Sequence, residues 1–210
     1  MTTNVYLARH GETVGNIEGR FCGHSETDLT PLGVAQARAL GRRLNGLRFD
    51  GVYASDLSRA AKTAEYALED HHGMAPVLDP AFREMHYGEW ESRVGREIGQ
   101  ESPALLADFF RCKVQAAPGG ESVQQLRTRT AAGLRNVVAR HSDGTVLVVS
   151  HGNAIAAMLA ELLAMPLEST WSFQLTNSSI SRLAFTKSGR LTVLSINDAS
   201  HIEGLTTGSD

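Results

Sequence analysis

Cysteine is scarce in this sequence: the 210-residue chain has two, Cys22 and Cys112, which lie far apart. Two such residues build neither a disulfide framework nor a zinc-ligand spacing, so disulfide-stapled and zinc-finger proteins are excluded. Reduced cysteines are typical of a reducing compartment. The first residues also lack the basic and apolar segments of a signal peptide. Both absences predict a cytoplasmic protein.

Long hydrophobic runs and a charge excess of one sign are also missing. The most apolar stretch, residues 154–167, is interrupted by Glu161 and Pro166 and is too short to cross a bilayer. Lys and Arg number 20 against 23 Asp and Glu, a net charge of −3, which argues against binding nucleic acid or membranes through bulk charge. We therefore expect neither kind of partner. Lysine is rare among the basic residues, and arginine, the majority, suits bidentate capture of phosphate or carboxylate.

Short apolar runs typical of buried strands alternate along the chain with amphipathic segments typical of helices. The strands are expected at residues 5–8, 51–54, 77–78 and 145–150, and the helices at residues 31–44, 56–68, 121–141 and 154–164. Residues 179–185 and 190–196 flank a Lys-Ser-Gly turn and predict a hairpin. This order predicts a three-layer α/β fold in one domain over residues 1–210. A mostly parallel central sheet is flanked by helices, with antiparallel strands added at the end.

Residues 85–118 do not fit the alternation. Gly88, Gly95, Gly99 and Pro103 interrupt the stretch, and a short apolar patch follows over residues 105–110. We interpret this segment as a lid-like insertion over the sheet, not as a second domain.

Cationic side chains follow three of the predicted strands, at the point where each strand ends. Arg9 and His10 follow the first, Arg59 lies one turn into the helix after the second, and His151 follows the strand at residues 145–150. Taken singly, each is more typical of a structural histidine or a solvated arginine. However, the carboxyl ends of parallel strands meet at one edge of a sheet. Arg59 also opposes the helix dipole unless it has an anionic partner. Together the four side chains predict a pocket for a dianion.

An ordered series of short motifs surrounds these four residues. The motifs are Arg9-His10-Gly11-Glu12-Thr13 with Asn16, Asp28-Leu29-Thr30, Ser55-Asp56-Leu57 with Arg59, Arg83-Glu84, Gly119-Gly120-Glu121-Ser122 and Ser150-His151-Gly152. In this order they resemble the histidine phosphatase superfamily, also called the phosphoglycerate mutase-like family, and its small bacterial phosphatases. The resemblance runs from residue 5 to about residue 201 and implies the fold expected above.

The resemblance also implies a role for each of five catalytic residues. His10 would be the nucleophile that attacks phosphorus and forms a phosphohistidine. Arg9, Arg59 and His151 would surround the transferring phosphoryl group and stabilise its charge. Glu84 would protonate the leaving oxygen and then accept a proton from water, which requires a raised pKa.

Further residues are expected to complete the site. Partial burial under Trp90 and Tyr87 is expected to raise the pKa of Glu84. Additional contacts to phosphate or substrate are expected from Asn16, Cys22, Gly23, Gly152 and Asn153. Residues 85–118 and 16–24 would set specificity.

Three functions remain open at this point. The first is a phosphomonoesterase that acts on a small phosphorylated metabolite. The second is a 2,3-bisphosphoglycerate-dependent phosphoglycerate mutase, which the motif ending in Asn153 resembles, although the short span between Arg59 and His151 favours the phosphatase. The third is a non-enzymatic phospholigand-binding or scaffold protein, which would lose at least one of the five catalytic residues, and all five are present.

The phosphate ligands themselves indicate that no metal or cofactor takes part. The sequence has no Gly-Lys dipeptide of a P-loop and no paired Asp-x-Asp of a magnesium-dependent phosphotransferase. Cationic phosphate ligands would repel a metal ion, so we expect metal-independent chemistry. The substrate and the oligomeric state stay open, although an edge strand in the terminal hairpin is compatible with a homodimer.

Overall fold

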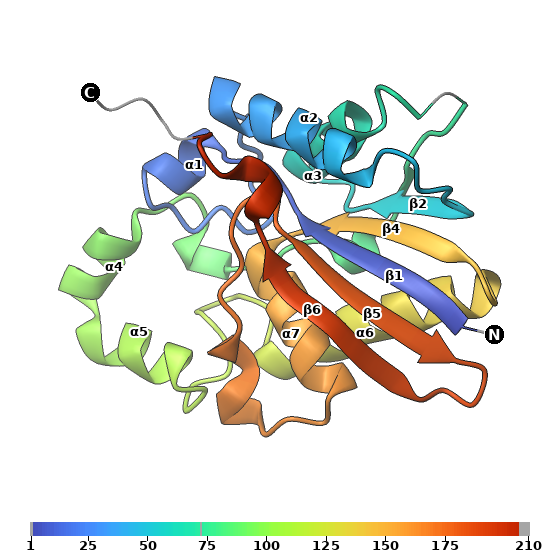
Figure 1. Cartoon of the computed structure of the whole chain (residues 1–210). Helices are drawn as coiled ribbons and strands as arrows, with labels where there is room; N and C mark the ends of the chain where they lie inside the picture. The colour runs from blue at the N-terminus through green and yellow to red at the C-terminus, as the bar shows by residue number, and fades with distance from the viewer. Residues whose placement is uncertain (1, 72, 206–210) are drawn as a thin grey trace.

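A computed structural model describes residues 2–71 and 73–205 and places a six-stranded sheet at the centre, in the order β3-β2-β4-β1-β5-β6 (Figure 1). The strands are β1 (Thr2–Arg9), β2 (Gly51–Ala54), β3 (Val77–Leu78), β4 (Thr145–Ser150), β5 (Ile180–Thr186) and β6 (Leu191–Asp198). The first four strands of the chain run parallel to one another, and β5 and β6 are antiparallel to their neighbours. The predicted mixed sheet with a terminal hairpin is therefore confirmed.

Helices cover both faces of the sheet and give the three predicted layers (Figure 1). One face carries α2 (Pro31–Leu44) and α3 (Ser58–Ala67), and the other carries α6 (Val123–Arg140) and α7 (Gly152–Leu162). Successive β4 residues alternate between the two cores: Val148 packs with α6 and α7 residues, and Leu147 packs with α2 and α3 residues. Because both faces are buried, residues 146–149 of β4 are all apolar.

Side-chain caps begin two of these helices where the sequence places them. The Thr30 hydroxyl accepts a hydrogen bond from the Gly33 N–H at 2.9 Å, and Pro31 takes the first helical position of α2. Ser122 and Gln125 form a capping box at the start of α6. Each cap stabilises its helix by about 1 kcal/mol, which explains why these starts are readable from sequence.

The register of the parallel strands brings their carboxyl ends to one edge. Arg9 of β1 lies opposite Ser150 of β4, and Ala54 of β2 lies opposite Val149. The next residues continue this ladder, since the His10 N–H donates to the Ser150 carbonyl at 2.9 Å. The segments that leave β1, β2 and β4 therefore start side by side.

Residues 85–118 lie beyond this edge and pack mainly on α6 and α7. The stretch between β3 and α6 contains the 3₁₀ turns η1 (Pro80–Phe82) and η2 (Gly88–Trp90) and the helices α4 (Gly95–Glu101) and α5 (Pro103–Phe110). Its buried Trp90, Ile98 and Phe109 form a separate core with Leu126 and Ala157. In Figure 1, α4 and α5 stand to one side of the sheet. Movement of this segment as a lid stays a prediction.

The remaining elements frame the same edge. They are α1 (Val14–Ile17), η3 (Leu167–Ser172) and η4 (Ser200–Ile202). At the far side of the sheet, β6 is an edge strand, as expected, and Leu194 on it is 48% exposed. Pairing of two copies through this edge stays a prediction. Across residues 2–71 and 73–205, no helix is long and apolar enough to span a bilayer.

Candidate active site

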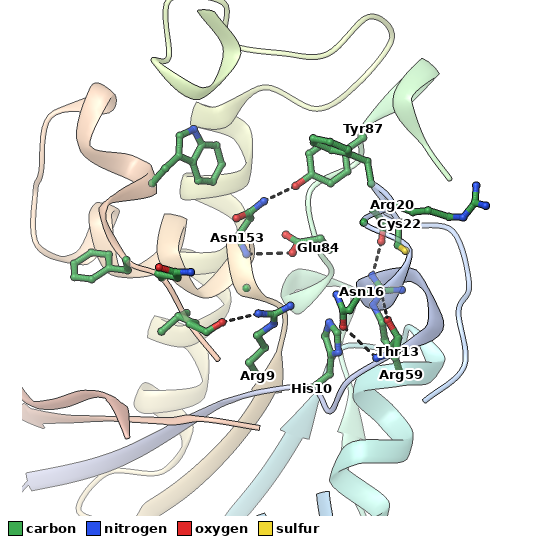
Figure 2. A pocket seen from close by; sticks show the side chains of 18 of the residues that line it. Arg9, His10, Thr13, Asn16, Arg20, Cys22, Arg59, Glu84, Tyr87 and Asn153 are labelled. Carbon is green, nitrogen blue, oxygen red and sulfur yellow. Dashed lines mark hydrogen bonds between the residues drawn. The ribbon is translucent and has the colours of Figure 1, made fainter. Parts of the chain in front are cut away.

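The predicted site residues gather around one cavity of about 530 Å³ beyond the carboxyl ends of the strands (Figure 2). Arg9 and His10 come from the end of β1, Arg59 from the first turn of α3, and Glu84 from the loop between η1 and η2. His151, the N-cap residue of α7, lies fully buried behind the cavity wall, with its ring centroid 5.1 Å from that of His10. Three separate strand ends and one loop thus supply a single pocket.

The hydrogen bond at one ring nitrogen fixes the tautomer of His10. Nδ1 lies 2.7 Å from the Gly11 carbonyl oxygen. Because a carbonyl accepts only, Nδ1 carries the proton and Nε2 keeps its lone pair while the ring is neutral. His10 can therefore act as a nucleophile through Nε2. The backbone N–H of Gly11 donates to the Thr63 hydroxyl at 3.0 Å and holds this turn in place.

The opposite tautomer follows for His151. Arg59 Nε lies 3.2 Å from His151 Nδ1, and a guanidinium nitrogen donates only, so Nδ1 accepts and Nε2 carries the proton. Within the described part of the chain, this buried Nε2–H has no hydrogen-bond partner. A buried donor without an acceptor costs free energy. An anion seated against His10 would remove that cost.

Both imidazoles are neutral near neutral pH. Burial lowers the pKa of His10 well below its ordinary value of 6.5, and the Arg59 and Arg9 guanidinium groups lower it further. Burial likewise lowers the pKa of His151, with additional contributions from Arg59 and His10. A neutral His10 is a requirement for nucleophilic attack, so the site stays competent into mildly acidic solution.

The two arginines retain donors for an anion after their protein contacts are made. The buried Arg59 donates from its terminal nitrogens to the carbonyls of Gly23 and Ser25, at 2.6 and 3.0 Å, and from Nε to His151. Since a guanidinium has five N–H groups, two remain. Arg9 donates to the Leu175 carbonyl at 2.5 Å, and its buried Nε has no partner among the described residues. Carbonyl and imidazole acceptors thus orient the Arg59 guanidinium, and binding of the predicted anion to its remaining donors stays a prediction.

Glu84 faces these cations from the opposite wall. Its carboxylate accepts from the Met85 N–H at 2.8 Å and from the Asn153 N–H at 3.1 Å. Burial raises the pKa of Glu84 above its ordinary value of 4.5, although both hydrogen bonds and the two arginines oppose the rise. The neighbouring Arg83 does not pair with Glu84, because it pairs with Asp56 through two contacts, at 2.7 and 2.6 Å.

All five predicted substrate contacts line the cavity: Asn16, Cys22, Gly23, Gly152 and Asn153. The Asn153 amide donates to the Tyr87 hydroxyl at 2.5 Å, which ties the start of α7 to the loop that carries Glu84 (Figure 2). Burial raises the pKa of Cys22, so its thiol is a wall group and a poor nucleophile. Tyr87 and Trp90 both belong to the core of residues 85–118, and Tyr87 also lines the cavity, whereas Trp90, expected beside it, does not.

The outer wall of the cavity consists of Arg20, Phe21, Phe110, Trp171, Phe173, Gln174 and Leu175. Arg20 and Phe21 lie within residues 16–24 and Phe110 within residues 85–118, the two ranges expected to set specificity, whereas the wall residues between 171 and 175 were not predicted. Arg20 is paired with Glu18 and with the Ser92 carbonyl. Most of the others are aromatic or aliphatic, and four lie between α7 and β5, where no helical or strand period marks them. Aromatic residues in an otherwise aromatic-poor chain were the available signal.

This fold and this site define an α/β protein that holds a neutral imidazole among fixed cations at the carboxyl edge of its sheet. The chain belongs to the histidine phosphatase superfamily (branch 1), whose sequence profile matches residues 5–199. The predicted family and the three-layer fold are both confirmed.

Individual relatives cover most of the chain. An adenosylcobalamin/alpha-ribazole phosphatase from Escherichia coli is 34% identical over 171 residues, 81% of this chain and 84% of the relative. A probable phosphoglycerate mutase GpmB from Erwinia tasmaniensis is 34% identical over 207 residues, 95% of this chain and 94% of the relative. Among solved structures, Bacillus stearothermophilus YhfR matches with a TM-score of 0.89 and 32% identity, over 95% of this chain and 99% of that one. The family and the alpha-ribazole phosphatase relative support the predicted phosphatase class of enzyme, whereas the GpmB relative carries the name of the mutase alternative.

Proposed function

We propose that this protein is a metal-independent phosphomonoesterase that hydrolyses a small phosphorylated metabolite through a phosphohistidine on His10. The observation that carries the proposal is the pair of fixed tautomers. The two buried rings are adjacent, and each has a free Nε2 atom: that of His10 carries a lone pair, and that of His151 carries a proton. One ring is suited to attack phosphorus and the other to bind a phosphoryl oxygen. A cytoplasmic setting, in which both free cysteines stay reduced, completes the proposal.

The first step transfers the phosphoryl group to the protein. His10 Nε2 forms a bond to phosphorus while the bond from phosphorus to the ester oxygen breaks. The leaving oxygen takes the proton of the Glu84 carboxyl. Arg9, Arg59 and the His151 N–H stabilise the charge on the three equatorial oxygens. The Gly11 carbonyl holds the Nδ1 proton and stabilises the phosphorylated ring.

The second step returns the protein to its starting state. A water molecule attacks phosphorus from the side that the alcohol has left, and the bond between phosphorus and Nε2 breaks. Glu84, now ionised, takes the water proton and becomes an acid again. Inorganic phosphate leaves, and His10 is neutral. One carboxyl group serves both steps, and burial, which raises its pKa, favours the protonated form that the first step needs.

The donor set around the cavity favours chemistry without a metal. Among the residues that the structure describes, no three His, Cys, Asp or Glu side chains form a metal-binding group. The phosphate ligands are instead guanidinium and N–H donors, which repel a cation. We expect treatment with excess EDTA, followed by gel filtration, to change kcat for p-nitrophenyl phosphate by less than about twofold. A large loss that added divalent metal restores would contradict the proposal.

The outer wall favours an uncharged leaving group. Phe21, Phe110, Trp171 and Phe173 present ring surface there, and Arg20 is already paired with the Glu18 carboxylate. A phosphoglycerate carries a carboxylate beyond its phosphate, and a bisphosphate carries a second phosphate. Each would lie against this apolar wall and lose hydration without a free cation as partner. Among the described residues of the outer wall, Arg20 is the cation and is paired, which weighs against the mutase alternative that the GpmB relatives and His151-Gly152-Asn153 support.

A substrate panel separates the two activities. We expect phosphate release from aryl and other apolar phosphate monoesters to exceed release from 3-phosphoglycerate by at least about 10²-fold in kcat/KM, since an uncompensated buried charge costs several kcal/mol. We also expect no interconversion of 2- and 3-phosphoglycerate, with or without 2,3-bisphosphoglycerate. Mutase turnover that 2,3-bisphosphoglycerate stimulates and that exceeds phosphate release would establish the alternative.

A further inference from the structure

Glu84 lies on a segment that has no regular secondary structure of its own. It follows η1 and precedes η2, so no helix or strand hydrogen bonds fix its peptide group. The Glu84 carboxyl must nevertheless stay in reach of both the leaving oxygen and the attacking water. A misplacement of about 1 Å costs about 10²-fold in rate for groups of this kind. The position of Glu84 therefore depends on contacts from elsewhere in the chain.

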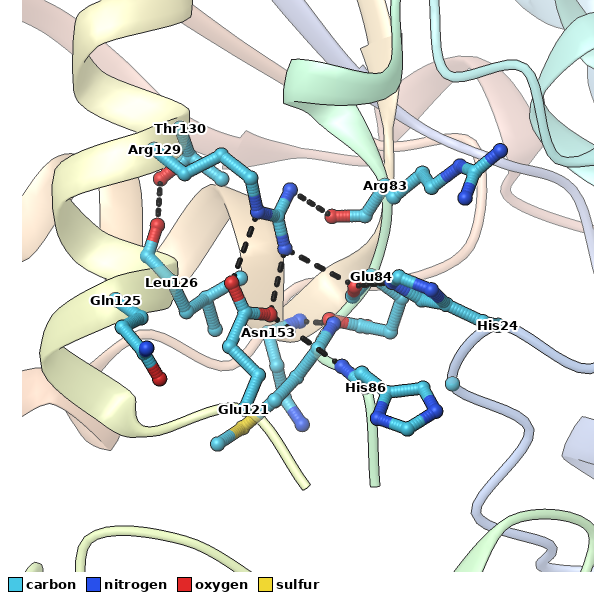
Figure 3. Close-up of polar contacts among 12 residues, drawn as sticks. His24, Arg83, Glu84, His86, Glu121, Gln125, Leu126, Arg129, Thr130 and Asn153 are labelled. Atoms are coloured by element: carbon cyan, nitrogen blue, oxygen red, sulfur yellow. Dashed lines mark hydrogen bonds and ion pairs between the residues drawn. The ribbon is translucent and has the colours of Figure 1, made fainter. Parts of the chain in front are cut away.

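Arg129, on α6, supplies most of these contacts (Figure 3). One terminal nitrogen donates to the Glu84 carbonyl at 3.2 Å. The other donates to the carbonyls of Ala81 and Arg83, both at 3.0 Å, and of Pro80 at 3.4 Å. A single guanidinium thus binds four carbonyls within five consecutive residues, 80–84.

Glu121 holds this guanidinium in a fixed orientation. Its two carboxylate oxygens accept from Arg129 Nε at 2.9 Å and from a terminal nitrogen at 2.7 Å. The Glu121 backbone N–H also donates to the His86 carbonyl at 2.8 Å. The Arg129 and Glu121 side chains are 25% and 14% exposed, so solvent screens the pair only in part. Bidentate pairing restricts both side chains to one geometry.

His24 provides a second donor to the same Glu84 carbonyl. Its Nε2 lies 3.0 Å from that oxygen, and burial lowers the pKa of the ring, which leaves it neutral with the proton on Nε2. The His24 loop is in turn fixed to the site, because Arg59 donates to the carbonyls on either side of it, those of Gly23 and Ser25. The peptide that carries the catalytic carboxyl is thereby tied to the phosphate-binding arginine.

We infer that Arg129, oriented by Glu121 and assisted by His24, is a positioning residue for Glu84 and sets how well Glu84 protonates the leaving oxygen. The inference rests on the proposed function, since it takes Glu84 as the acid. Arg129 does not line the cavity and has no direct contact with substrate in this arrangement. Its loss should weaken acid catalysis selectively, not the attack by His10.

Two substrates of similar size and polarity measure this selectivity. Benzyl phosphate expels a strongly basic alkoxide that needs a proton, whereas p-nitrophenyl phosphate expels a stabilised phenolate that does not. We expect Arg129→Gln to lower the ratio of kcat/KM for benzyl phosphate to that for p-nitrophenyl phosphate by about 10- to 100-fold. In the Glu84→Gln background the same substitution should not lower the ratio further, because the acid is already gone.

Arg127 offers a matched control on the same helix. It is buried, pairs with Glu161, and donates to the carbonyls of Ala160 and Met165, so it performs a similar structural task away from Glu84. Arg127→Gln should lower the unfolding temperature without changing the substrate ratio. If Arg129→Gln does not fold, His24→Phe removes the second donor, and we expect it to lower the ratio by at least about threefold.

The outcomes separate this inference from the proposed function. If Glu84→Gln lowers the ratio but Arg129→Gln and His24→Phe lower both rates equally, as Arg127→Gln does, the positioning role is wrong and the acid role stands. If Glu84→Gln itself leaves the ratio unchanged, the acid role is wrong and the inference falls with it. A selective loss in Arg129→Gln that is absent in Arg127→Gln supports both.

Discussion

His10→Ala should abolish turnover of p-nitrophenyl phosphate, with kcat reduced by roughly 10⁴- to 10⁶-fold, the range found when an attacking nucleophile is removed. The expectation follows from the geometry of the ring, whose Nδ1 is committed to the Gly11 carbonyl and whose Nε2 is left with the lone pair. The neighbouring side chains at the site cannot replace the His10 ring as the nucleophile. His151 presents a proton, and the Cys22 thiol has a raised pKa.

The variant should remain folded, since the substitution removes one partly polar side chain from a pocket and leaves the main cores intact. His141→Ala is a suitable control. His141 is half-buried and hydrogen bonded to the Tyr53 hydroxyl, and it caps the far, C-terminal end of α6. The His141→Ala variant should be less stable than the wild-type protein but equally active per folded molecule. Turnover by folded His10→Ala above about 1% of the wild-type rate would place the nucleophile elsewhere.

Glu84→Gln should cost about 10²- to 10⁴-fold in kcat/KM for benzyl phosphate and less than about tenfold for p-nitrophenyl phosphate. Gln keeps the size of the side chain and one oxygen that can accept from the Met85 or the Asn153 N–H, but it carries no acidic proton. Only the substrate whose leaving oxygen needs that proton should suffer the full loss. Steady-state kinetics with both esters checks this, and equal losses would assign Glu84 a binding role in place of an acid role.

The pH profile gives a second test of the same carboxyl group. Catalysis requires protonated Glu84 and neutral His10 together. Because the His10 pKa is depressed, mainly by burial, activity toward benzyl phosphate should fall on the acid side only below pH 6.5. Because burial raises the Glu84 pKa, the alkaline loss should begin above the ordinary value of 4.5. In Glu84→Gln the alkaline limb should disappear, and an unchanged limb would assign it to another group.

Local sequence patterns predicted the positions of the basic residues of the site better than the position of its acidic residue, Glu84. Arg9, His10, Arg59 and His151 follow strand ends, and strand ends of a parallel sheet converge whatever their separation along the chain. Glu84 follows no such element, and only its resemblance to a family motif singled it out. Its place is set by Asn153 and Arg129, whose contacts with it depend on the packed structure.

The sheet and its helices were predictable for a related physical reason. β4 is buried on both faces, and α2 and α6 begin with capping residues. The hydrophobic pattern and the local hydrogen bonds therefore favour the same secondary structure in these segments. Residues 85–118 lack that agreement, because they build a small core of their own against α6 and α7. There Trp90 and Tyr87 both pack against Phe109, and Tyr87 also lines the cavity.

The most direct test is to trap the phosphoryl group on the protein. We would mix the enzyme with excess p-nitrophenyl phosphate and quench it during turnover in alkali, in which phosphohistidine survives. Peptide mass spectrometry would then locate the phosphoryl group. A phosphoryl group on His10 in the wild-type protein, and none in His10→Ala, is the predicted result. Full turnover with an unmodified His10, or a phosphoryl group on another side chain, would contradict the mechanism at its first step.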